Sequence, residues 1–535
     1  MQTDVLVIGS GAAGMYAALA AARAGAQVLL VDRSLIGRGG ATVMAQMTVA
    51  VALGEEVPDD TDYHLADTLK AGRGLCDEPL ARLLCEEAPA CIRELDGWAV
   101  GWARKDGHIS QVQAPGHDRP RCVYVDFVNT GPAVSKTLRA QLQRTSAVRR
   151  TGDLVVTELA LRDGICNGAH AVHLPSGEGV PIAAKATIVA TGGLTRLYAR
   201  NSASTNMGGD GYALALRAGA ELIDMEFVQF FPIGHLAPRL VGMDPIMWDP
   251  FRYKLGGRLL NAEKHEFLGE EGRYATARDQ ATHAILAEVA QGRGSPHGGA
   301  WLSFEHCNED ELRAAFGPII DRLAANGIDL TCQAIEVAPI AHYHMGGVRV
   351  DADMRTSVPH LFAAGEAVGG ANGANRLSGN AISEALVFGR RAGERAAAVA
   401  GQTAMPTPAP SAAAAAVAGC DINPAAEIVR LQRLMNEHVG PLRNAQGLER
   451  ALGHLRALSE ACTLLPRPRA GFDSEWLDRH DLRNMRLVAE CITRAAVART
   501  ESRGAHQRDD FPQSDGAWQR HQRVRLAAEE LRLES

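Results

Sequence analysis

A glycine-rich turn near the N-terminus constrains the fold of this chain most strongly. Residues 9–14 (GSGAAG) follow a β-branched run over residues 4–8 and precede an Ala-rich, helix-forming stretch. In such a G-x-G-x-x-G turn, Gly9 permits the tight turn, Gly11 lets the backbone approach a pyrophosphate, and Gly14 lets the helix and strand pack closely. The phosphates would lie at the helix N-terminus, where unpaired N–H groups and the helix dipole favour an anion.

A second strand and an acidic residue strengthen this interpretation. Residues 26–31 (AQVLLV) have the apolar pattern of a buried strand, and Asp32 follows at its end, 18 residues after Gly14. A carboxylate at that place can accept a hydrogen bond from a ribose hydroxyl. The strand–helix–strand unit therefore predicts an α/β fold with a doubly wound sheet, a Rossmann-like domain that binds a dinucleotide.

Two later segments repeat the pattern of a strand followed by glycine. The apolar run 186–190 (ATIVA) precedes Thr191-Gly192-Gly193, and the run 361–364 (LFAA) precedes Gly365-Glu366. We expect these central strands and the first one to end at the same ligand. A long cofactor that touches several strand ends favours FAD over NAD.

Changes in composition along the chain predict its domains. Residues 1–234 and 336–400 form the FAD-binding domain, and residues 235–335, with short helices and polar loops, form an inserted α+β capping domain. Residues 401–420 are a Pro/Ala-rich linker. Over residues 421–535 apolar positions recur every three or four residues, which predicts a C-terminal helical domain.

Composition and charge exclude several classes of protein. The hydrophobic fraction of 46% and the charged fraction of 22% are typical of a soluble globular chain. The net charge of −7, without a long basic run, argues against nucleic acid as a partner. No membrane span and no signal peptide are evident. The ten cysteines include no Cys-x-x-Cys pair, so we expect a cytoplasmic protein with reduced thiols and no metal site.

A set of motifs along the chain carries a family resemblance. They are IGSGAAG (8–14), ATGG (190–193), GDG (209–211), MEFVQF (225–230), RDQ (278–280), AHYHMGG (341–347), GANRLSGNAISE (373–384) and RTESRGAH (499–506). Together they resemble the flavoprotein superfamily of succinate dehydrogenase, fumarate reductase and L-aspartate oxidase over nearly the whole chain. The overall length and the stretches 67–77 and 327–330 are most similar to L-aspartate oxidase.

The resemblance and the glycine-rich turns imply FAD as the cofactor. The expected cofactor contacts are Gly9, Ser10, Gly11, Ala12, Ala13, Gly14, Asp32, Arg33, Gly40, Ala41, Thr42, Ala45, Gln46, Thr48, Thr191, Gly192, Gly193, Asp210, Glu366, Ala381 and Ile382. Membrane-bound relatives attach FAD covalently through a His in an Arg-Ser-His-Thr stretch. The matching residues 38–42 (RGGAT) contain no His, so we expect noncovalent FAD.

The resemblance also implies where the substrate reacts. In the family, hydride passes between a substrate carbon and flavin N5, and an Arg of an Arg-Asp motif moves a proton at the neighbouring carbon; Arg278 matches that Arg. His342 and Arg376 match positions that bind a substrate carboxylate, for which a guanidinium fork is well suited. The alternatives are an Arg278 that only pairs with a carboxylate and a His342 with a structural role. His344 fits a packed core histidine better than a metal ligand.

The chain departs from the family on the far side of the substrate. Phe231 stands where relatives carry a His, and the stretch 246–257 lacks the family's Thr-Glu pair and contains Trp248, Phe251 and Arg252. We expect Phe231, Trp248, Phe251 and Arg252 to contact the substrate. Alternatively, the aromatic residues pack a domain interface, and Asp249, Arg252 or Lys254 replaces part of the proton relay.

These features predict a soluble, cytoplasmic FAD-dependent oxidoreductase. It would dehydrogenate a carboxylate substrate, or reduce an enoate, at a CH–CH or CH–NH bond. The substrate would be a monocarboxylate or an amino acid with a less polar far end. The alternatives are an L-aspartate oxidase that forms iminoaspartate for NAD biosynthesis, and the flavoprotein subunit of a succinate dehydrogenase/fumarate reductase-like complex. The electron acceptor stays open.

Overall fold

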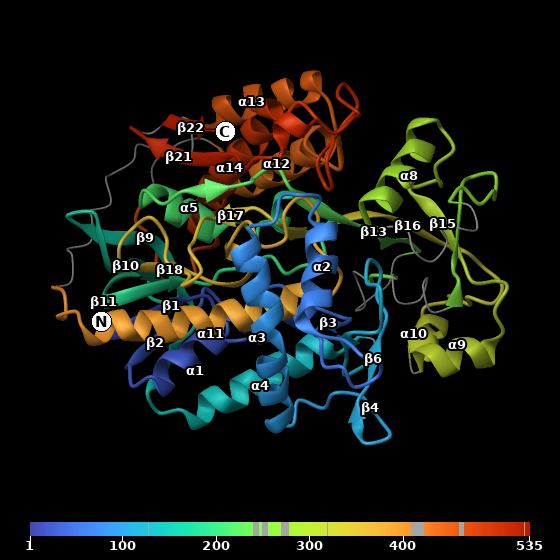
Figure 1. The fold of residues 1–535 in the computed structure, drawn as a ribbon. Helices are drawn as coiled ribbons and strands as arrows, with labels where there is room; N and C mark the ends of the chain where they lie inside the picture. Colours follow the sequence, from blue (N-terminus) through green and yellow to red (C-terminus); the bar gives the residue numbers. More distant parts are fainter. Residues whose placement is uncertain are drawn as a thin grey trace.

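The computed structural model describes most of the chain (Figure 1). The described residues are 1–126, 128–238, 246–248, 255–268, 278–317, 319–407, 422–459, 465–528 and 530–534. Phe251 and Arg252 therefore lie outside the described residues, as do Asp249 and Lys254.

The central sheet joins strands that are far apart in the sequence. Its members are β1 (Gln2–Ile8), β2 (Val28–Val31), β8 (Val148–Thr151), β9 (Leu154–Arg162), β10 (Ile165–His173), β11 (Glu178–Val189) and β18 (Leu361–Ala363). The order is β8-β2-β1-β11-β10-β9, and β18 pairs with the last residues of β11. Strands β8, β2, β1, β11 and β18 run parallel, whereas β10 is antiparallel to both of its neighbours, β11 and β9. The three strands expected to end at glycine turns, β1, β11 and β18, are therefore parallel neighbours, and their carboxyl ends lie on the same side of the sheet.

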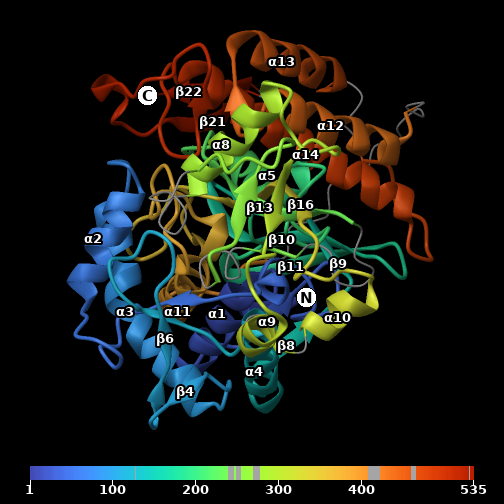
Figure 2. The same ribbon diagram turned by 90° about the vertical axis from the view of Figure 1, so that its right-hand side faces the viewer.

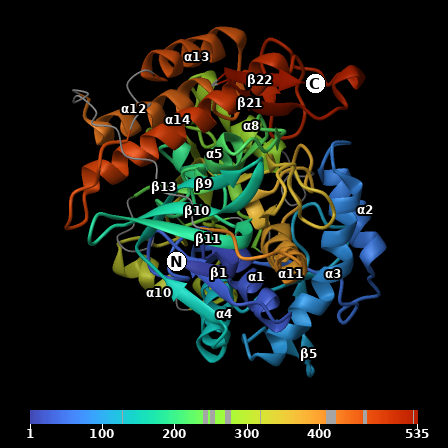
Figure 3. The same cartoon turned by 90° about the vertical axis from the view of Figure 1, so that its left-hand side faces the viewer.

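Helices cover both faces of this sheet (Figures 1 and 3). One side carries α1 (Ala12–Arg23), α3 (Glu78–Gly97), α4 (Thr130–Arg144) and α11 (Asn380–Gly401), and the other carries α5 (Asp210–Arg217). Strands β2 and β18 and most of β1 are continuous apolar runs, as expected where both faces of a parallel sheet are buried. A small sheet of β3 (Val49–Ala50), β6 (Gln111–Val112) and β7 (Cys122–Val123) and helix α2 (Thr61–Ala71) lie beside α3.

A second unit is inserted between β12 (Leu222–Ile223) and β17 (Gly347–Val348). Its antiparallel sheet has the order β13 (Val228–Ala237), β16 (Ile335–His344), β15 (Ala300–Ser303) and β14 (Arg258–Leu260). Helices α8 (Arg278–Ala290), α9 (Glu309–Phe316) and α10 (Ile319–Ala325) complete it (Figure 2). A separate apolar core forms here around Phe231, Trp248 and Phe304. The exact domain limits stay a prediction.

The C-terminal region contains more than helices. Helices α12 (Pro424–His438), α13 (Ala445–Ser459) and α14 (Ser474–Ala498) pack on one another, and α14 also packs against α5. The hairpin of β21 (Arg523–Ala527) and β22 (Glu530–Glu534) was not evident from the sequence; β21 pairs with β12 of the first domain. Short strands β19 (Leu442–Arg443) and β20 (Gln507–Arg508) also pair.

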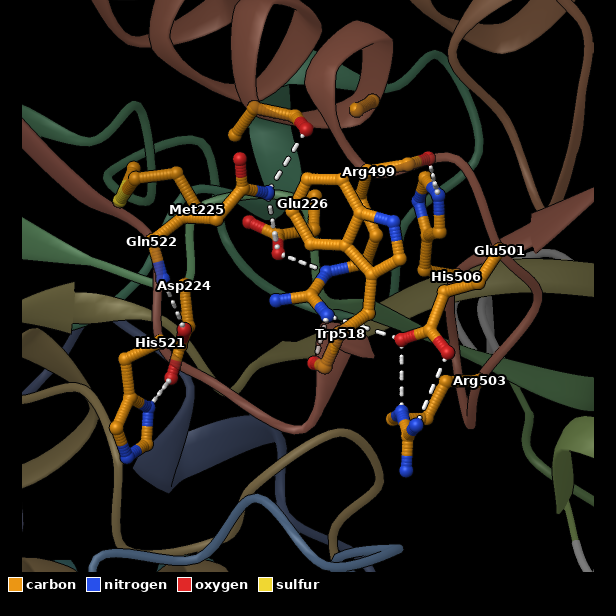
Figure 4. A network of polar contacts seen from close by, with 12 residues as sticks. Asp224, Met225, Glu226, Arg499, Glu501, Arg503, His506, Trp518, His521 and Gln522 are labelled. Atoms are coloured by element: carbon orange, nitrogen blue, oxygen red, sulfur yellow. Dashed lines mark hydrogen bonds and ion pairs between the residues drawn. The ribbon is translucent and has the colours of Figure 1, made fainter. Parts of the chain in front are cut away.

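The turn between β12 and β13 is held by the C-terminal region (Figure 4). Asp224 accepts a hydrogen bond from His521 at 2.6 Å. The Glu226 carboxylate accepts from Arg499 at 2.6 Å and from Gln522 at 2.8 Å. Arg499 in turn donates to Glu501 at 2.9 Å. These buried charges fix the point where the chain enters the capping domain.

The eight described cysteines are free, and all but Cys76 and Cys332 are buried. Within the described residues, no helix combines the length and the apolar character that crossing a membrane requires.

Candidate active site

One open cleft gathers most of the predicted cofactor residues. It measures about 1520 Å³ including its solvent-filled mouth. Of the 21 positions predicted from the sequence, all except Gly14 and Gly193 line it. Arg278, His342 and Arg376 line the same cleft, so the predicted cofactor and substrate positions lie together.

The two exceptions have packing roles. A Cβ atom on Gly14 would lie 1.9 Å from the carbonyl oxygen of Gly9, and one on Gly193 would lie 2.2 Å from Oε1 of Glu366. Both glycines therefore allow close approach of neighbouring backbone and side chains, as expected for the last glycine of the turn.

The turn before α1 fits a pyrophosphate. Gly9 has φ +101°, a conformation that favours glycine. Gly11 is the N-cap of α1 and offers no capping side chain, and a Cβ atom there would meet only Oγ1 of Thr42, at 3.6 Å. The space above Gly11 is therefore open toward the cleft, where a phosphate can approach the helix N-terminus.

This difference between the glycines predicts the effect of two substitutions. We expect Gly11→Val to fold but to lose FAD binding, because its side chain enters open cleft space that the pyrophosphate needs. Gly14→Val should fail to fold normally, because its side chain overlaps the backbone of Gly9. Thermal unfolding of the apoprotein and quenching of FAD fluorescence separate the two effects. A Gly11→Val protein that binds FAD normally would contradict the assignment.

Asp32 has a role that the sequence did not indicate. Its Oδ2 accepts hydrogen bonds from the backbone N–H and the hydroxyl of Ser10, at 2.9 and 2.6 Å. Its Oδ1 accepts from the N–H and the hydroxyl of Ser34, at 2.8 and 2.9 Å. Four donors fill the accepting capacity of a carboxylate. Asp32 thus lines the cleft and holds the turn at Ser10, and its contact with a ribose hydroxyl stays a prediction.

Arg278 begins helix α8 at the capping-domain end of the cleft. Its Nη2 donates to the hydroxyl of Ser378 at 3.0 Å, and its Nη1 lies 3.5 Å from Oε1 of Gln229. The guanidinium carbon stands 5.1 Å from the centre of the Phe231 ring. The neighbouring Asp279 pairs with Arg73 at 3.1 Å. Ser378 and two residues of β13, Gln229 and Phe231, therefore surround this guanidinium.

Arg376 is a buried cation beside Arg278. It is 3% exposed, and its guanidinium lies over the ring of Tyr343 at 4.3 Å. Its Nη1 donates to the carbonyl of Leu377 at 3.2 Å, and its Nε is buried without a hydrogen-bond partner. Burial and the charge of Arg278 lower its pKa to about 10. Among the described residues no carboxylate is within ion-pair distance, so this cation favours an anionic ligand.

His342 completes this end of the cleft. Its Nδ1 lies 2.7 Å from the hydroxyl of Ser202, and its ring meets Phe231 edge to face, with centroids 5.4 Å apart. Burial and the charges of Arg278 and Arg376 hold the pKa of His342 well below its usual range. The imidazole is therefore neutral at physiological pH and can donate one hydrogen bond.

The aromatic residues predicted to touch the substrate lie elsewhere. Phe231 is fully buried and contacts Arg278 and His342 from behind the cleft wall. Trp248 is also fully buried, in the capping-domain core, and its Nε1 donates to Nδ1 of His235 at 3.1 Å. The expectation that Phe231 and Trp248 line the substrate site is therefore corrected by the structure. The alternative placed the aromatic residues at a domain interface, whereas both belong to the apolar core within the capping domain.

Methionines occupy the cleft wall instead. Met47 and Met247 line the cleft, and both pack with the capping-domain core. The N–H of Met247 donates to Oε1 of Gln46 at 3.2 Å. Neighbouring residues of an extended segment point to opposite sides, so Met247 faces the cleft while Trp248 faces the core. That alternation is the sequence signal that would have identified Met247.

His344 is a core residue, as expected. Its Nδ1 lies 3.2 Å from the hydroxyl of Tyr212 and its Nε2 lies 3.1 Å from the carbonyl of Met225. Burial lowers its pKa to about 3. Glu366 lines the cleft close by, accepts the N–H of His344 at 3.1 Å, and has its pKa raised to about 8 by burial.

Comparisons with known proteins identify the family. The FAD binding domain family matches residues 4–382, and the fumarate reductase flavoprotein C-terminal family matches residues 429–535.

The chain is 35% identical over 532 residues to a subunit of fumarate reductase (CoM/CoB) from Methanothermobacter marburgensis, covering 97% of this chain and 96% of that protein. It is 34% identical over 546 residues to L-aspartate oxidase of Streptomyces coelicolor, covering 98% and 91%. The solved structure of Mycobacterium smegmatis Sdh1 in complex with UQ1 has a TM-score of 0.89 at 35% identity, covering 100% of this chain and 94% of that one. The chain therefore belongs to the flavoprotein family of fumarate reductase, succinate dehydrogenase and L-aspartate oxidase, and it is an FAD-dependent oxidoreductase.

Proposed function

We propose that this oxidoreductase acts on a substrate that binds through a carboxylate, at a CH–CH or CH–NH bond. The observation that carries the proposal is the buried Arg376, which has no carboxylate partner among the described residues and lines the cleft beside Arg278 and His342. A substrate carboxylate would supply the missing negative charge.

Each of the three side chains has a distinct task. Arg376 pairs with the carboxylate through its guanidinium fork, and neutral His342 donates one further hydrogen bond. FAD, when bound, supplies the hydride acceptor or donor. Arg278 gives a proton to the substrate carbon in the reductive direction, or takes one from it in the oxidative direction. Because a guanidinium is ordinarily locked in its charged form, Arg278 must exchange that proton with a relay during each turnover.

The far end of the substrate should be weakly polar. Met47 and Met247 offer flexible, polarizable thioethers rather than hydrogen-bond donors. An ionised second carboxylate placed there would lose hydration without gaining partners from these side chains. An apolar group would instead gain about 25 cal/mol for each Å² buried. These properties favour a monocarboxylate or an amino acid with a bulkier, less polar end.

Anaerobic flavin bleaching tests the proposal directly. The FAD-loaded protein is mixed with pairs of substrates that share the reacting bond and differ in one carboxylate, with succinate and L-aspartate included. Bleaching by monocarboxylates supports the proposal. Bleaching by neutral amides of the same acids, with equal efficiency, would contradict a role for the carboxylate.

Removing the carboxylate receptor should mainly weaken substrate binding. Arg376→Ala and His342→Ala are expected to raise KM at least tenfold, because truncation leaves the substrate charge unpaired in a desolvated site. Maximal turnover should change less than KM. A loss confined to kcat would contradict the assignment. Ser202→Ala, which removes the partner of His342 Nδ1, is the milder control.

The flavin should be bound without a covalent link. No His occurs in residues 38–42, and Ala41 lines the cleft at the matching position. Acid precipitation of the purified yellow protein should therefore release FAD into the supernatant. Flavin that stays with the precipitate would overturn this prediction.

Two other functions are favoured by particular relatives. The likeness to the L-aspartate oxidase of Streptomyces coelicolor makes oxidation of L-aspartate the second candidate. The relative from Methanothermobacter marburgensis is one subunit of its enzyme, which makes work within a complex the third. The substrate panel and pull-down from the native host separate them.

A further inference from the structure

Arg33 stands where dinucleotide-binding folds distinguish two kinds of cofactor. It follows Asp32 at the end of β2 and lines the cleft. At this place a nearby Arg typically accepts the 2′-phosphate of a phosphorylated adenosine, while folds that take the unphosphorylated ribose present a carboxylate. By its sequence position alone, Arg33 would favour a 2′-phosphate.

In the structure, carboxylates from two domains balance the positive charge of Arg33. Its Nη1 donates to Oδ2 of Asp210 at 2.9 Å. Its Nη2 contacts the Asp481 carboxylate, with Oδ1 at 2.7 Å and Oδ2 at 3.0 Å. Asp210 begins α5 and lines the cleft, whereas Asp481 lies on helix α14 of the C-terminal region. The Asp481 side chain is only 3% exposed, so water screens this pair weakly.

Further side chains of α14 contact the same residues around Arg33. Asn484 lies three residues after Asp481, on the same face of the helix, and its amide donates to Oδ1 of Asp210 at 2.8 Å. Arg217 donates to Oδ1 of Asn484 at 3.0 Å, and Arg196 pairs with Asp481. The spacing of Asp210, His480 and Asp481 resembles a metal site. Because Arg33 and Arg196 already pair with the carboxylates, we assign no ion to it.

We propose that Asp481 of α14 is a specificity residue: by holding Arg33 against Asp210 and Asp481, it makes the cleft accept an adenosine dinucleotide without a 2′-phosphate and reject one with it. A phosphate dianion in the cleft would meet an Arg33 whose charge Asp481 and Asp210 already balance, and it would also face the Asp210 carboxylate that lines the cleft. The neutral ribose hydroxyls of FAD meet no such repulsion. The C-terminal domain thus completes the selectivity of the FAD-binding domain.

The test uses competition against FAD on the apoprotein. The probes are ADP and its 2′-phosphorylated form, 2′-phosphoadenosine 5′-diphosphate, with displacement followed by FAD fluorescence. The wild-type protein should bind ADP more tightly than the phosphorylated probe. In Asp481→Asn, which keeps the shape and removes one charge, this preference should fall about tenfold.

Three variants make the result specific. Glu475→Gln removes the same charge from the same helix at an exposed position, so it should leave the preference unchanged. Asn484→Asp adds a charge beside Asp210 and should strengthen the rejection of the 2′-phosphate. In an Arg33→Gln background, Asp481→Asn should no longer change the ratio of the two affinities.

Several outcomes would overturn the proposal. One is an unchanged ratio in Asp481→Asn, and another is an equal change in Glu475→Gln. A third is an equal loss of affinity for both probes in Asp481→Asn, if Ile492→Val causes the same loss. Ile492→Val is a destabilising change in the buried face of α14. The last result would assign Asp481 a structural role only. Should Asp481→Asn fail to fold, the opposite shift expected of Asn484→Asp decides the question.

Discussion

Replacing Arg278 with Lys should lower turnover by about two to four orders of magnitude, the range for loss of a general acid–base group, while FAD binding stays nearly unchanged. The Lys ammonium is a single point charge and cannot reach both Ser378 and Gln229 while lying against Phe231. The proton donor would therefore no longer be held at the substrate carbon. Single-turnover flavin reduction and the FAD content of the purified variant measure the two effects separately.

The control for this experiment is Ser378→Ala, which removes one contact of Arg278 and leaves the guanidinium in place. It should cost far less turnover than Arg278→Lys. An Arg278→Lys protein with normal kcat and a raised KM would show instead that Arg278 positions the substrate. The proton would then travel through another group.

Dicarboxylates should be poor substrates, which is the second large effect we expect. We predict kcat/KM for L-aspartate below about 10⁴ M⁻¹s⁻¹. Succinate and fumarate should react slowly as well, because Met47 and Met247 cannot pair with a second carboxylate. Monocarboxylates with an apolar far end should react fastest. Steady-state kinetics on matched mono- and dicarboxylates provide the comparison.

Variants at two neighbouring positions test which residue sets this preference. Met247→Arg would place a cation on the cleft wall and should shift the preference toward dicarboxylates by at least tenfold. Trp248→Phe, whose side chain lies in the capping-domain core, should alter stability rather than specificity. Efficient oxidation of L-aspartate by the unmodified protein would refute the prediction and favour an L-aspartate oxidase.

The sequence predicted those parts of the fold that depend on residues close together in the chain. The glycine turn, helix α1 and the ends of β1, β11 and β18 follow from apolar runs and glycine positions, and the structure has them as expected. The β21–β22 hairpin could not be predicted because β21 gains its stability from β12, which lies far earlier in the sequence. Residues 523–527 and 530–534 do alternate polar and apolar side chains, as half-buried strands do, but so short a pattern does not identify the distant strand with which β21 pairs.

In the candidate site, too, the sequence identified the residues but not the contacts that they make with distant segments. Arg278, His342 and Arg376 were identified from motifs, and the structure places all three on one cleft. The roles of Asp32 and Trp248 depended on which side each residue faces. Four donors surround Asp32, and a one-residue alternation turns Trp248 inward while Met247 faces the cleft. Such orientations are set by neighbours in space, which periodicity does not reveal.

The pairing of distant segments has a consequence for how this protein is made. The central sheet needs β18, near residue 360, and the partner of Arg33 is Asp481 on α14. At about 5–20 residues per second a ribosome needs roughly half a minute to two minutes for a chain of this size. For most of that time the nascent N-terminal segment has a glycine turn but an incomplete cleft around it. FAD should therefore be loaded after release from the ribosome, and slow long-range strand pairing should set the rate of that loading.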